Sequence, residues 1–276
     1  MTITKDRAIL FRTRGSDHGP VTRLVSPGEL GQRLKPFVFL DLFRSQHSAD
    51  RQRFALHPHS GIATLTYMIE GEVAYEDTTG KQGVLPTGGV EWMSAGNGVW
   101  HGATAMGTAG MVGFQLWVAL PPNEENAPAH SLYLAPADIP QSGPVRVLLG
   151  RYGNLNSPIQ ASTEMTYLAV TLKKGEHWRY TPPAGHTVAW LAVNSGQLGA
   201  ENPVGAGELV VFDESEQPID LLARVETSFV LGSAVKHPHH LVMGYYSVHT
   251  SEAALALGEA EIRRIGTQLR EQGRLD

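Results

Sequence analysis

The stretch from Thr64 to Gly96, TLTYMIEGEVAYEDTTGKQGVLPTGGVEWMSAG, alternates short apolar segments with glycine-rich turns. The segments TLTYMI, EVAYED, GVLPTGG and VEWMSAG are rich in the β-branched and aromatic residues typical of strands. Gly71 and Gly80 stand at turn positions between them. No apolar stripe with helical spacing interrupts the series. The stretch therefore predicts antiparallel β structure in a closed or sandwiched barrel.

The whole chain is long enough for two such barrels. Its 276 residues are many for one ordinary domain and natural for two. The segment TVAWLAVNSGQLGAENPVGAGELVVFDES, at residues 187–215, repeats the order of strand, turn glycine and glycine-led strand. The Pro- and Ala-rich stretch near residues 121–144 is the candidate linker between the halves. A further buried strand is expected at FVFLDLF, Phe37–Phe43.

The C-terminal segment changes to helical period. Apolar residues and one glycine recur there at the spacing of a helix face: Leu255, Gly258, Ile262, Ile265 and Leu269. Thr250 or Ser251 can serve as N-cap, and Gly273 follows the expected end. One amphipathic helix is therefore expected to pack against a barrel.

Composition and charge exclude several classes of function. The chain has 22 basic and 27 acidic residues, a formal charge of −5 and no long run of either sign, which disfavours binding to nucleic acid or to an anionic membrane. It has no cysteine, which excludes disulfides, thiolate nucleophiles and cysteine-ligated metals. The N-terminus mixes charges into its apolar residues, and no apolar run is long enough to span a bilayer. A cytoplasmic protein is the expectation.

Three histidines are the candidate metal ligands. In a strand, His57 and His59 point to the same face, because side chains alternate. His101 follows a glycine-rich turn in SAGNGVWHGATA, where a neighbouring strand could bring a third imidazole. Three histidines with open positions for water or substrate are typical of a catalytic metal site, and imidazole suits iron, zinc, copper or nickel. The competing interpretation is that these are polar residues at loop ends.

The second half has the strand pattern without the ligand pair. His57 and His59 lie 14 and 12 residues before Gly71, and the matching places before the turn glycine Gly196 hold Pro182 and Ala184. His186 stands alone nearby and is interpreted as a loop histidine.

The motif His-Pro-His occurs again at residues 237–239, with a different context. It leads into LVMGYYSVHTS, with no turn glycine twelve or fourteen residues later and no third histidine on a nearby predicted strand. A surface loop is the favoured interpretation, with adventitious metal capture as the alternative.

Long segments of the chain resemble the pirin family of bicupin proteins. The segments HPHSGIATLTYMIEGEVAYEDTTGKQGV, GGVEWMSAGNGVWH and GFQLWVALP carry the resemblance, and LVMGYYSVHTSEAALA is similar to the family's C-terminal signature. The resemblance runs in order from about Phe37 to the final helix. It implies an all-β fold of two cupin-type jelly-roll barrels with a C-terminal α-helix. The implied boundaries are 1–135 for the metal-binding barrel, 136–249 for a barrel without ligands, and 250–276 for the helix.

The resemblance also implies a cofactor and an activity. The family's metal ligands fall on His57, His59 and His101, and the implied cofactor is one mononuclear divalent metal, foremost Fe2+, with Zn, Cu, Ni, Mn and Co left open. Some members are flavonol (quercetin) 2,3-dioxygenases, and others are regulatory proteins that act through a protein partner. The first hypothesis is therefore an oxygenase that takes O2 and a small aromatic or enolic substrate. The second is a metal-binding or metal-free regulatory protein.

The sequence departs from the family where carboxylates are expected. The family has a carboxylate two residues after the third histidine and often a glutamate four residues after the second, and these places hold Ala103 and Ala63. Strand parity predicts that both lie on the face of the histidines. Without those carboxylates the site lacks an anionic ligand and its obvious general base.

Three hypotheses for the site follow. An anionic substrate could supply the missing charge to a three-histidine iron site. Alternatively, Glu91 or Gln115 could replace the carboxylate as ligand or base, although Glu91 is also interpreted as a solvated strand residue. Finally, the protein could be a metal-poor binding module. Gln115 and Trp117 share a strand face and are assigned, with Ala63 and Ala103, to the substrate pocket.

Overall fold

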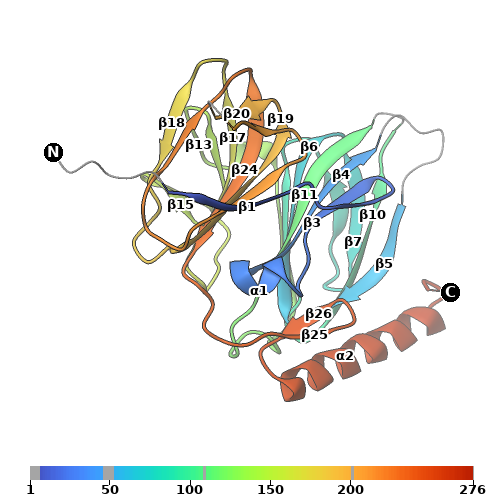
Figure 1. Cartoon of the computed structure of the whole chain (residues 1–276). Coiled ribbons are helices and arrows are strands. Elements are labelled where there is room, and N and C mark those ends of the chain that lie inside the picture. Colours follow the sequence, from blue (N-terminus) through green and yellow to red (C-terminus); the bar gives the residue numbers. More distant parts are fainter. Residues whose placement is uncertain (1–6, 46–52, 108–109, 200–201, 276) are drawn as a thin grey trace. The chain divides into compact units, whose positions relative to one another are not determined.

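The computed structural model describes residues 7–45, 53–107, 110–199 and 202–275, and strands dominate it (Figure 1). The described residues fall into two compact units. The histidine unit contains residues 18–21, 25–138 and 237–275, apart from 46–52, 108 and 109. The C-terminal unit contains residues 7–17, 22–24 and 139–236, apart from 200 and 201.

The histidine unit is built on two antiparallel sheets. The seven-stranded sheet has the order β12-β9-β6-β11-β4-β3-β2, and the four-stranded sheet has the order β5-β10-β7-β8. The strands of the larger sheet are β2 (Ser16–His18), β3 (Val21–Val25), β4 (Phe37–Ser45), β6 (Ile62–Glu70), β9 (Val90–Ser94), β11 (Met111–Ala119) and β12 (His130–Leu134). Those of the smaller sheet are β5 (Arg53–His59), β7 (Val73–Asp77), β8 (Gln82–Leu85) and β10 (Val99–Ala105).

A row of polar residues crosses the larger sheet. Cross-strand partners share a face of a sheet, and the pairing of five neighbouring strands aligns one such row. Its members are Tyr133, Glu91, Thr66, Gln115 and Asp41. The next row on the same face includes Thr64 and Trp117, because these residues are partners between β6 and β11.

A short hairpin and a helix complete the histidine unit. The hairpin consists of β25 (Val242–Gly244) and β26 (Ser247–His249), and the helix α2 spans Glu252–Glu271. Ser251 caps α2 by accepting a hydrogen bond from the amide of Ala254. The indole Nε1 of Trp100, on β10, donates to the carbonyl of Ile262 at 2.8 Å. The helix therefore packs on the smaller sheet. A short helix α1 (Leu30–Leu34) precedes β4.

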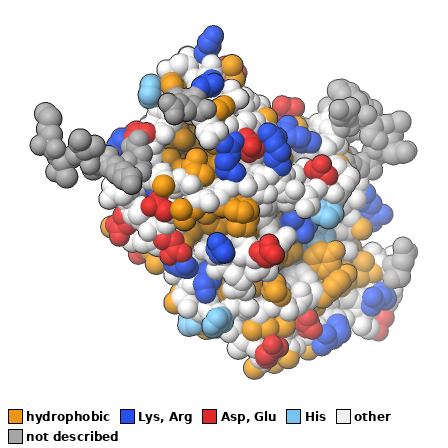
Figure 2. Space-filling view, in the orientation of Figure 1, with side chains coloured by type: hydrophobic (Ala, Val, Ile, Leu, Met, Phe, Trp, Pro, Cys, Tyr) orange, Lys and Arg blue, Asp and Glu red, His pale blue; other side chains and the backbone are white. Residues whose placement is uncertain are grey.

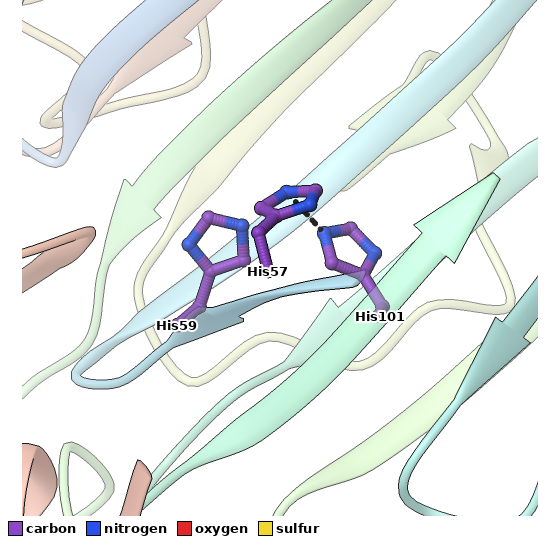
Figure 3. Close-up of side chains that lie close together, drawn as sticks. All are labelled: His57, His59 and His101. Carbon is purple, nitrogen blue, oxygen red and sulfur yellow. Dashed lines mark hydrogen bonds between the residues drawn. The ribbon is translucent and has the colours of Figure 1, made fainter. Parts of the chain in front are cut away.

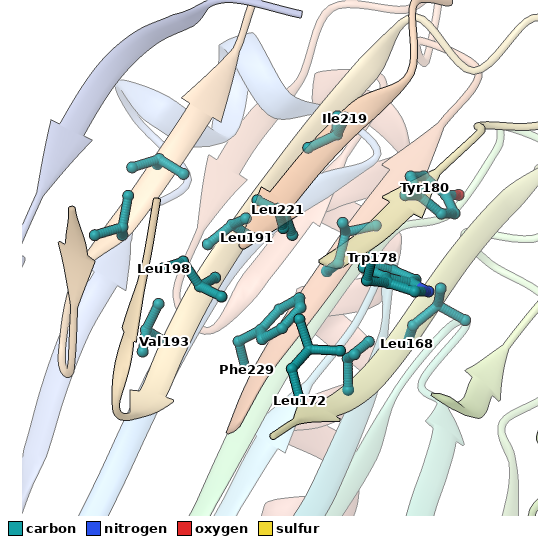
Figure 4. Close-up of a cluster of buried hydrophobic side chains, with 14 of the residues drawn as sticks. Leu168, Leu172, Trp178, Tyr180, Leu191, Val193, Leu198, Ile219, Leu221 and Phe229 are labelled. Atoms are coloured by element: carbon teal, nitrogen blue, oxygen red, sulfur yellow. The ribbon is translucent and has the colours of Figure 1, made fainter. Parts of the chain in front are cut away.

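The C-terminal unit is a second antiparallel assembly with its own core. Its seven-stranded sheet has the order β1-β22-β19-β24-β17-β14-β13, with β1 (Ile9–Thr13), β13 (Gln141–Ser142), β14 (Val145–Leu149), β17 (Met165–Leu172), β19 (Val188–Ser195), β22 (Leu209–Phe212) and β24 (Thr227–Ala234). Two-stranded sheets pair β15 (Arg151–Tyr152) with β16 (Leu155–Asn156), β18 (His177–Tyr180) with β23 (Ile219–Leu222), and β20 (Gln197–Leu198) with β21 (Val204–Gly205). Buried side chains such as Leu191, Phe229 and Trp178 fill the space between these sheets (Figure 4).

The predicted all-β fold with a C-terminal helix is confirmed, whereas the chain boundaries differ from the prediction. Strand β1 forms the edge of its sheet and pairs with β22, so Ile9–Thr13 belong with the C-terminal half. Residues 237–249 belong to the histidine unit. The change of unit between residues 138 and 139 falls inside the predicted linker 121–144, three residues after the predicted boundary, although residues 130–134 of that stretch form β12 and pair with β9.

Surface charge matches the mixed composition of the sequence. Figure 2 shows basic and acidic side chains interspersed on the visible face, without a broad area of one sign. Of the helices that the described residues form, none combines the length and the apolar character needed to cross a bilayer.

Candidate metal centre

Three histidines converge from two adjacent strands of the smaller sheet. His57 and His59 lie at the end of β5, and His101 on β10 is the cross-strand partner of His57. One ring nitrogen from each lies within 4.8 Å of the others, and the rings face a common point (Figure 3). Within the described part of the chain, no second group of three or more histidine or carboxylate side chains comes this close. The structure thus brings together the three residues that the sequence singled out.

An oxygen atom holds the Nδ1 side of each ring. The Nδ1 atom of His57 lies 2.9 Å from the carbonyl oxygen of Ala55, and that of His59 lies 3.0 Å from the carbonyl oxygen of Tyr246. The Nδ1 atom of His101 lies 3.2 Å from Oε1 of Glu91. Because these oxygens can only accept, Nδ1 donates and Nε2 keeps its lone pair. All three rings are therefore oriented as metal-binding histidines are.

The Nε2 atoms fit one shared ion. The Nε2 atoms of His57 and His101 are 3.1 Å apart. Two metal–nitrogen bonds of about 2.1 Å at a right angle place their nitrogens about 3 Å apart. His59 is fully buried, and its Nε2 has no hydrogen-bond partner among the described residues. A buried nitrogen left without a partner is what a missing ion would explain.

Burial keeps His57 and His59 neutral. Burial, and then the proximity of His101, lowers the pKa of His57 to about 4. The pKa of His59 is lowered well below its usual value, again chiefly by burial and then by His57. Both rings are uncharged at neutral pH, as a metal ligand must be.

Glu91 supports the site from behind His101. Its side chain is buried, accepts a hydrogen bond from Oγ1 of Thr66 at 2.6 Å and faces Nδ1 of His101. Burial alone would raise the pKa of Glu91, but hydrogen bonds from His101, Thr66 and Tyr133 outweigh it and lower that pKa. The interpretation of Glu91 as a solvated strand residue is therefore wrong. Its register on β9 places it on the inner face, in the polar row.

A second buried carboxylate, Asp77, is the cross-strand partner of His101. Asp77 on β7 accepts hydrogen bonds from Ser131 at 2.7 Å and from the Tyr133 hydroxyl at 2.9 Å. The same hydroxyl lies 3.3 Å from Oε1 of Glu91. A phenol has one proton, so Tyr133 donates to one of these carboxylates at a time. Burial and both carboxylates raise the pKa of Tyr133, which keeps it a neutral donor.

The two alanines at the expected carboxylate positions lie on different faces. Ala103 pairs in unbroken register with β7, so it lies on the face of His101 as predicted. The prediction for Ala63 is wrong: the β6 residue on the histidine side is Thr64, since its partner Trp117 has its ring centroid 4.8 Å from that of His59. The chain bends at Gly61, with φ at 72°, between strands of different sheets, so parity counted from His59 fails there.

Thr64 is a site residue that the sequence did not reveal. It is fully buried, and its hydroxyl finds no hydrogen-bond partner in the described residues. Its position seven residues before the turn glycine Gly71 was the available signal. Neither face position near the histidines, Ala103 or Thr64, offers a carboxylate.

Aromatic side chains form part of the site wall. Trp117 is nearly buried and stacks on Phe39, with ring centroids 4.0 Å apart. Gln115 lies two positions from Trp117 on the same face of β11 and is half-buried. The structure thus places both predicted pocket residues on the inner face of the larger sheet.

Tyr246 brings the C-terminal hairpin to the metal centre. Its ring centroid lies 5.8 Å from that of His57 and 6.0 Å from that of His59, while its backbone carbonyl accepts from His59. Tyr246 is 41% exposed and His57 is half-buried, so the accessible side of the site lies here. Its φ of 55° is unusual for a residue with a side chain. This contact could not be predicted from the sequence, because 187 residues separate Tyr246 from His59.

A buried chain of polar groups fixes this hairpin to β5. Ser60 donates to Oγ of Ser247 at 2.8 Å and lies 2.9 Å from Nε2 of His249. His249 in turn lies 3.3 Å from the carboxylate of Glu125. The serine, histidine and glutamate are all buried, and Gly258 of α2 packs directly on Ser60, so they hold the hairpin in place rather than meet a substrate.

The other histidines that the sequence singled out, at positions 186, 237 and 239, are not part of this cluster. In the second His-Pro-His motif, His239 is exposed as predicted for a surface loop, but His237 is buried. His186 lies in a loop, as predicted, but its side chain is buried, with Nδ1 2.9 Å from Oγ of Ser233. Burial lowers the pKa of His186 to about 4.

Comparison with known proteins places the whole chain among related sequences. The family model described as Pirin matches residues 20–118. A Pseudomonas aeruginosa protein named "Putative quercetin 2,3-dioxygenase" is 30% identical over 247 residues, 83% of this chain and 85% of that protein. A pirin-like protein from Solanum lycopersicum is 30% identical over 230 residues, covering 77% of this chain and 78% of the relative.

Solved structures show the same fold. Quercetin 2,3-dioxygenase from Acinetobacter baumannii superposes with a TM-score of 0.86 at 24% identity, covering 94% of this chain and 98% of that one. A bacterial pirin from Escherichia coli in complex with nickel(II) gives a TM-score of 0.63 at 20% identity, covering 84% of this chain and 96% of that one. The predicted pair of cupin-type barrels is thereby confirmed.

Proposed function

Since this chain belongs to the pirin family, we propose that it is a metal-dependent oxygenase of the quercetin 2,3-dioxygenase type, with His57, His59 and His101 as its metal ligands. The observation that carries the proposal is the convergence of three imidazoles, those of His59 and His101 buried and that of His57 half-buried, whose Nδ1 atoms all lie against acceptors. A divalent ion bound there would supply Lewis acidity and, in the case of iron, reactivity toward O2. We propose Fe2+ as this ion, with Ni2+ as the first alternative because a similar bacterial pirin was solved with nickel(II).

The residues around the histidines suit a flat, electron-rich substrate. The rings of Trp117 and Tyr246 both lie beside His59, at centroid distances of 4.8 and 6.0 Å. Aromatic groups attract one another in stacked or edge-to-face arrangements, which favours an aromatic ligand between them. Gln115 carries both a donor and an acceptor on the same inner face and can orient a substrate hydroxyl or carbonyl.

The proton of the substrate poses a separate requirement. Glu91 faces Nδ1 of His101, on the opposite side of that ring from the shared Nε2 point. It therefore cannot take a proton directly from a substrate at that point. Ala103 and Thr64 offer no base either. We infer that the substrate binds as its anion, so that an acidic enolic hydroxyl supplies the charge that the ligand set lacks.

Metal analysis and oxygen uptake test the proposal. Purified protein should contain close to one equivalent of a divalent metal, and His57→Ala or His59→Ala should lose it. His239→Ala, at the exposed end of the second His-Pro-His motif, is the matched control and should keep the metal. Iron-loaded protein should consume O2 in the presence of quercetin. A fully loaded sample that consumes none with quercetin or another enolic substrate would contradict the proposed activity.

A further inference from the structure

Glu91 is the carboxylate in contact with the histidine cluster. Its Oε1 lies 3.2 Å from Nδ1 of His101, and both side chains are buried. The two residues come from different sheets: Glu91 lies on β9 of the larger sheet and His101 on β10 of the smaller. This contact therefore joins the sheets at the metal centre.

We propose that Glu91 is a positioning residue that supplies, through His101, the negative charge that the metal face lost at Ala103. The inference rests on the proposed function, in that the three histidines must hold a divalent metal. A carboxylate that accepts the Nδ1 proton fixes the ring and makes Nε2 a stronger donor to the ion. Glu91 does this without occupying a coordination position, so the open positions stay available to substrate.

The geometry excludes a direct ligand role for Glu91 in this arrangement. The Nδ1 and Nε2 atoms lie on opposite sides of an imidazole ring, and Nε2 of His101 points to Nε2 of His57. For the carboxylate to reach the shared point, the ring of His101 would have to leave it. Glu91 therefore acts on the ion through His101.

Neighbouring donors hold the carboxylate in this position. Thr66 donates to Oε2 at 2.6 Å, and the Tyr133 hydroxyl lies 3.3 Å from Oε1. Thr66 and Tyr133 are also the cross-strand neighbours of Glu91 in the polar row, so strand pairing itself fixes the two donors. A buried carboxylate with these partners is pre-oriented toward His101 before any ion binds.

Asp77 provides a matched comparison. It is also a buried carboxylate on the inner face, directly opposite His101 in the register of β7 and β10. Its hydrogen bonds come from Thr79, Ser131, Tyr133 and the amide of Lys81, and none comes from an imidazole. If charge in the barrel interior were enough, Asp77 would serve as well as Glu91. If the contact with Nδ1 is required, only Glu91 matters.

The experiment measures metal binding and the metal's spectrum. Glu91→Gln keeps an acceptor of the same shape but removes the charge. Titration of metal-free protein with Co2+ should show a dissociation constant 10- to 100-fold larger for E91Q than for the natural protein. The visible ligand-field bands of bound Co2+ should also shift. D77N should stay within about threefold of the natural protein, with an unchanged spectrum. The double variant E91Q/A103E, with a carboxylate returned to the metal face, should recover affinity.

The outcomes separate this inference from the proposed function. Equal Co2+ affinity and an equal spectrum for E91Q and natural protein would overturn the role of Glu91 while leaving the three-histidine site intact. No binding of Co2+ by the natural protein would overturn the site itself. If circular dichroism shows that E91Q does not fold, Thr66→Val decides, since it releases the carboxylate without removing the charge. A folded T66V should bind Co2+ three- to tenfold more weakly, and an unchanged affinity would refute the proposal.

Discussion

Tyr246 combines an unusual backbone with an aromatic ring at the metal centre, and two substitutions can separate these features. Its φ of 55° lies in the left-handed region, which costs a residue with a Cβ about 1 kcal/mol or more and costs glycine nothing. Tyr246→Gly removes both ring and strain, whereas Tyr246→Ala removes only the ring. The comparison of these two variants therefore isolates the backbone, and the comparison of Tyr246→Ala with the natural protein isolates the ring.

The expected magnitudes follow from the geometry. Y246G should be more stable than Y246A by about 1 kcal/mol, the reverse of the usual order of alanine and glycine in regular structure. The Tyr246 ring lies about 6 Å from the rings of His57 and His59. An aromatic ligand bound beside these histidines would therefore lose one aromatic neighbour in either variant. Such contacts contribute about 0.5–1.5 kcal/mol, so quercetin should bind about 3- to 10-fold more weakly to both variants. Metal affinity should be unchanged, because the backbone carbonyl that orients His59 remains.

Urea denaturation measures the stability difference. Calorimetry measures the Co2+ affinity, and fluorescence quenching measures the binding of quercetin. Tyr245→Ala is the control, since Tyr245 is 68% exposed and its φ is not in the left-handed region. It should leave stability and quercetin affinity nearly unchanged. A Y246A protein as stable as Y246G would refute the argument from strain. Unchanged quercetin affinity in both variants would refute the placement of the substrate beside this ring.

Four further substitutions test other features of the structure. As pH falls from 6.5 to about 4, the unfolded state binds a proton that the buried ring of His186 does not, so the unfolding free energy of the natural protein falls by about 3 kcal/mol. His186→Gln should remove this loss. Urea titrations across this range check the prediction, and an unchanged dependence of stability on pH would contradict it. Gly258→Ala would place a Cβ 2.5 Å from Oγ of Ser60 and should lower the unfolding free energy by about 1–3 kcal/mol despite better helix propensity, which thermal unfolding measures. Ala103→Glu should tighten Co2+ binding at least tenfold. Ala63→Glu, buried on the other face, should give no gain in Co2+ affinity and should lower the unfolding free energy by several kcal/mol. An equal gain in affinity from both variants would show that the assigned faces are wrong.

Local pattern was enough to predict the strands and the three histidines. The period of two within β5 places His57 and His59 on one face, and the glycine-led strand of His101 lies beside them in the sheet. The final helix was equally predictable, since Leu255, Gly258, Ile262 and Leu269 are all buried on one face.

Features that depend on register or on distant segments were not predictable. Parity failed at Ala63 because the chain changes sheets at Gly61, and a one-residue slip exchanges the two faces of a strand. Glu91 could not be placed without the pairing of β9 with β6. Tyr246 reaches the histidines through a hairpin that follows the whole C-terminal unit in sequence. Each of these facts belongs to tertiary pairing rather than to local propensity.

The distribution of charge explains how a site without a ligand carboxylate can suit an anionic substrate. Both buried carboxylates of the polar network, Glu91 and Asp77, lie behind His101, while the substrate side presents Ala103, Thr64 and neutral imidazoles. A carboxylate at position 103 would repel an ionised enol that shares the same ion, because like charges in a buried site interact strongly. On the proposed function, Glu91 strengthens His101 as a ligand without adding a negative charge to the open side of the ion. The Ala103→Glu variant should therefore hold metal more tightly and at the same time bind the quercetin anion more weakly. Tighter binding of both the metal and the anion would show that the charge on the substrate side has no role.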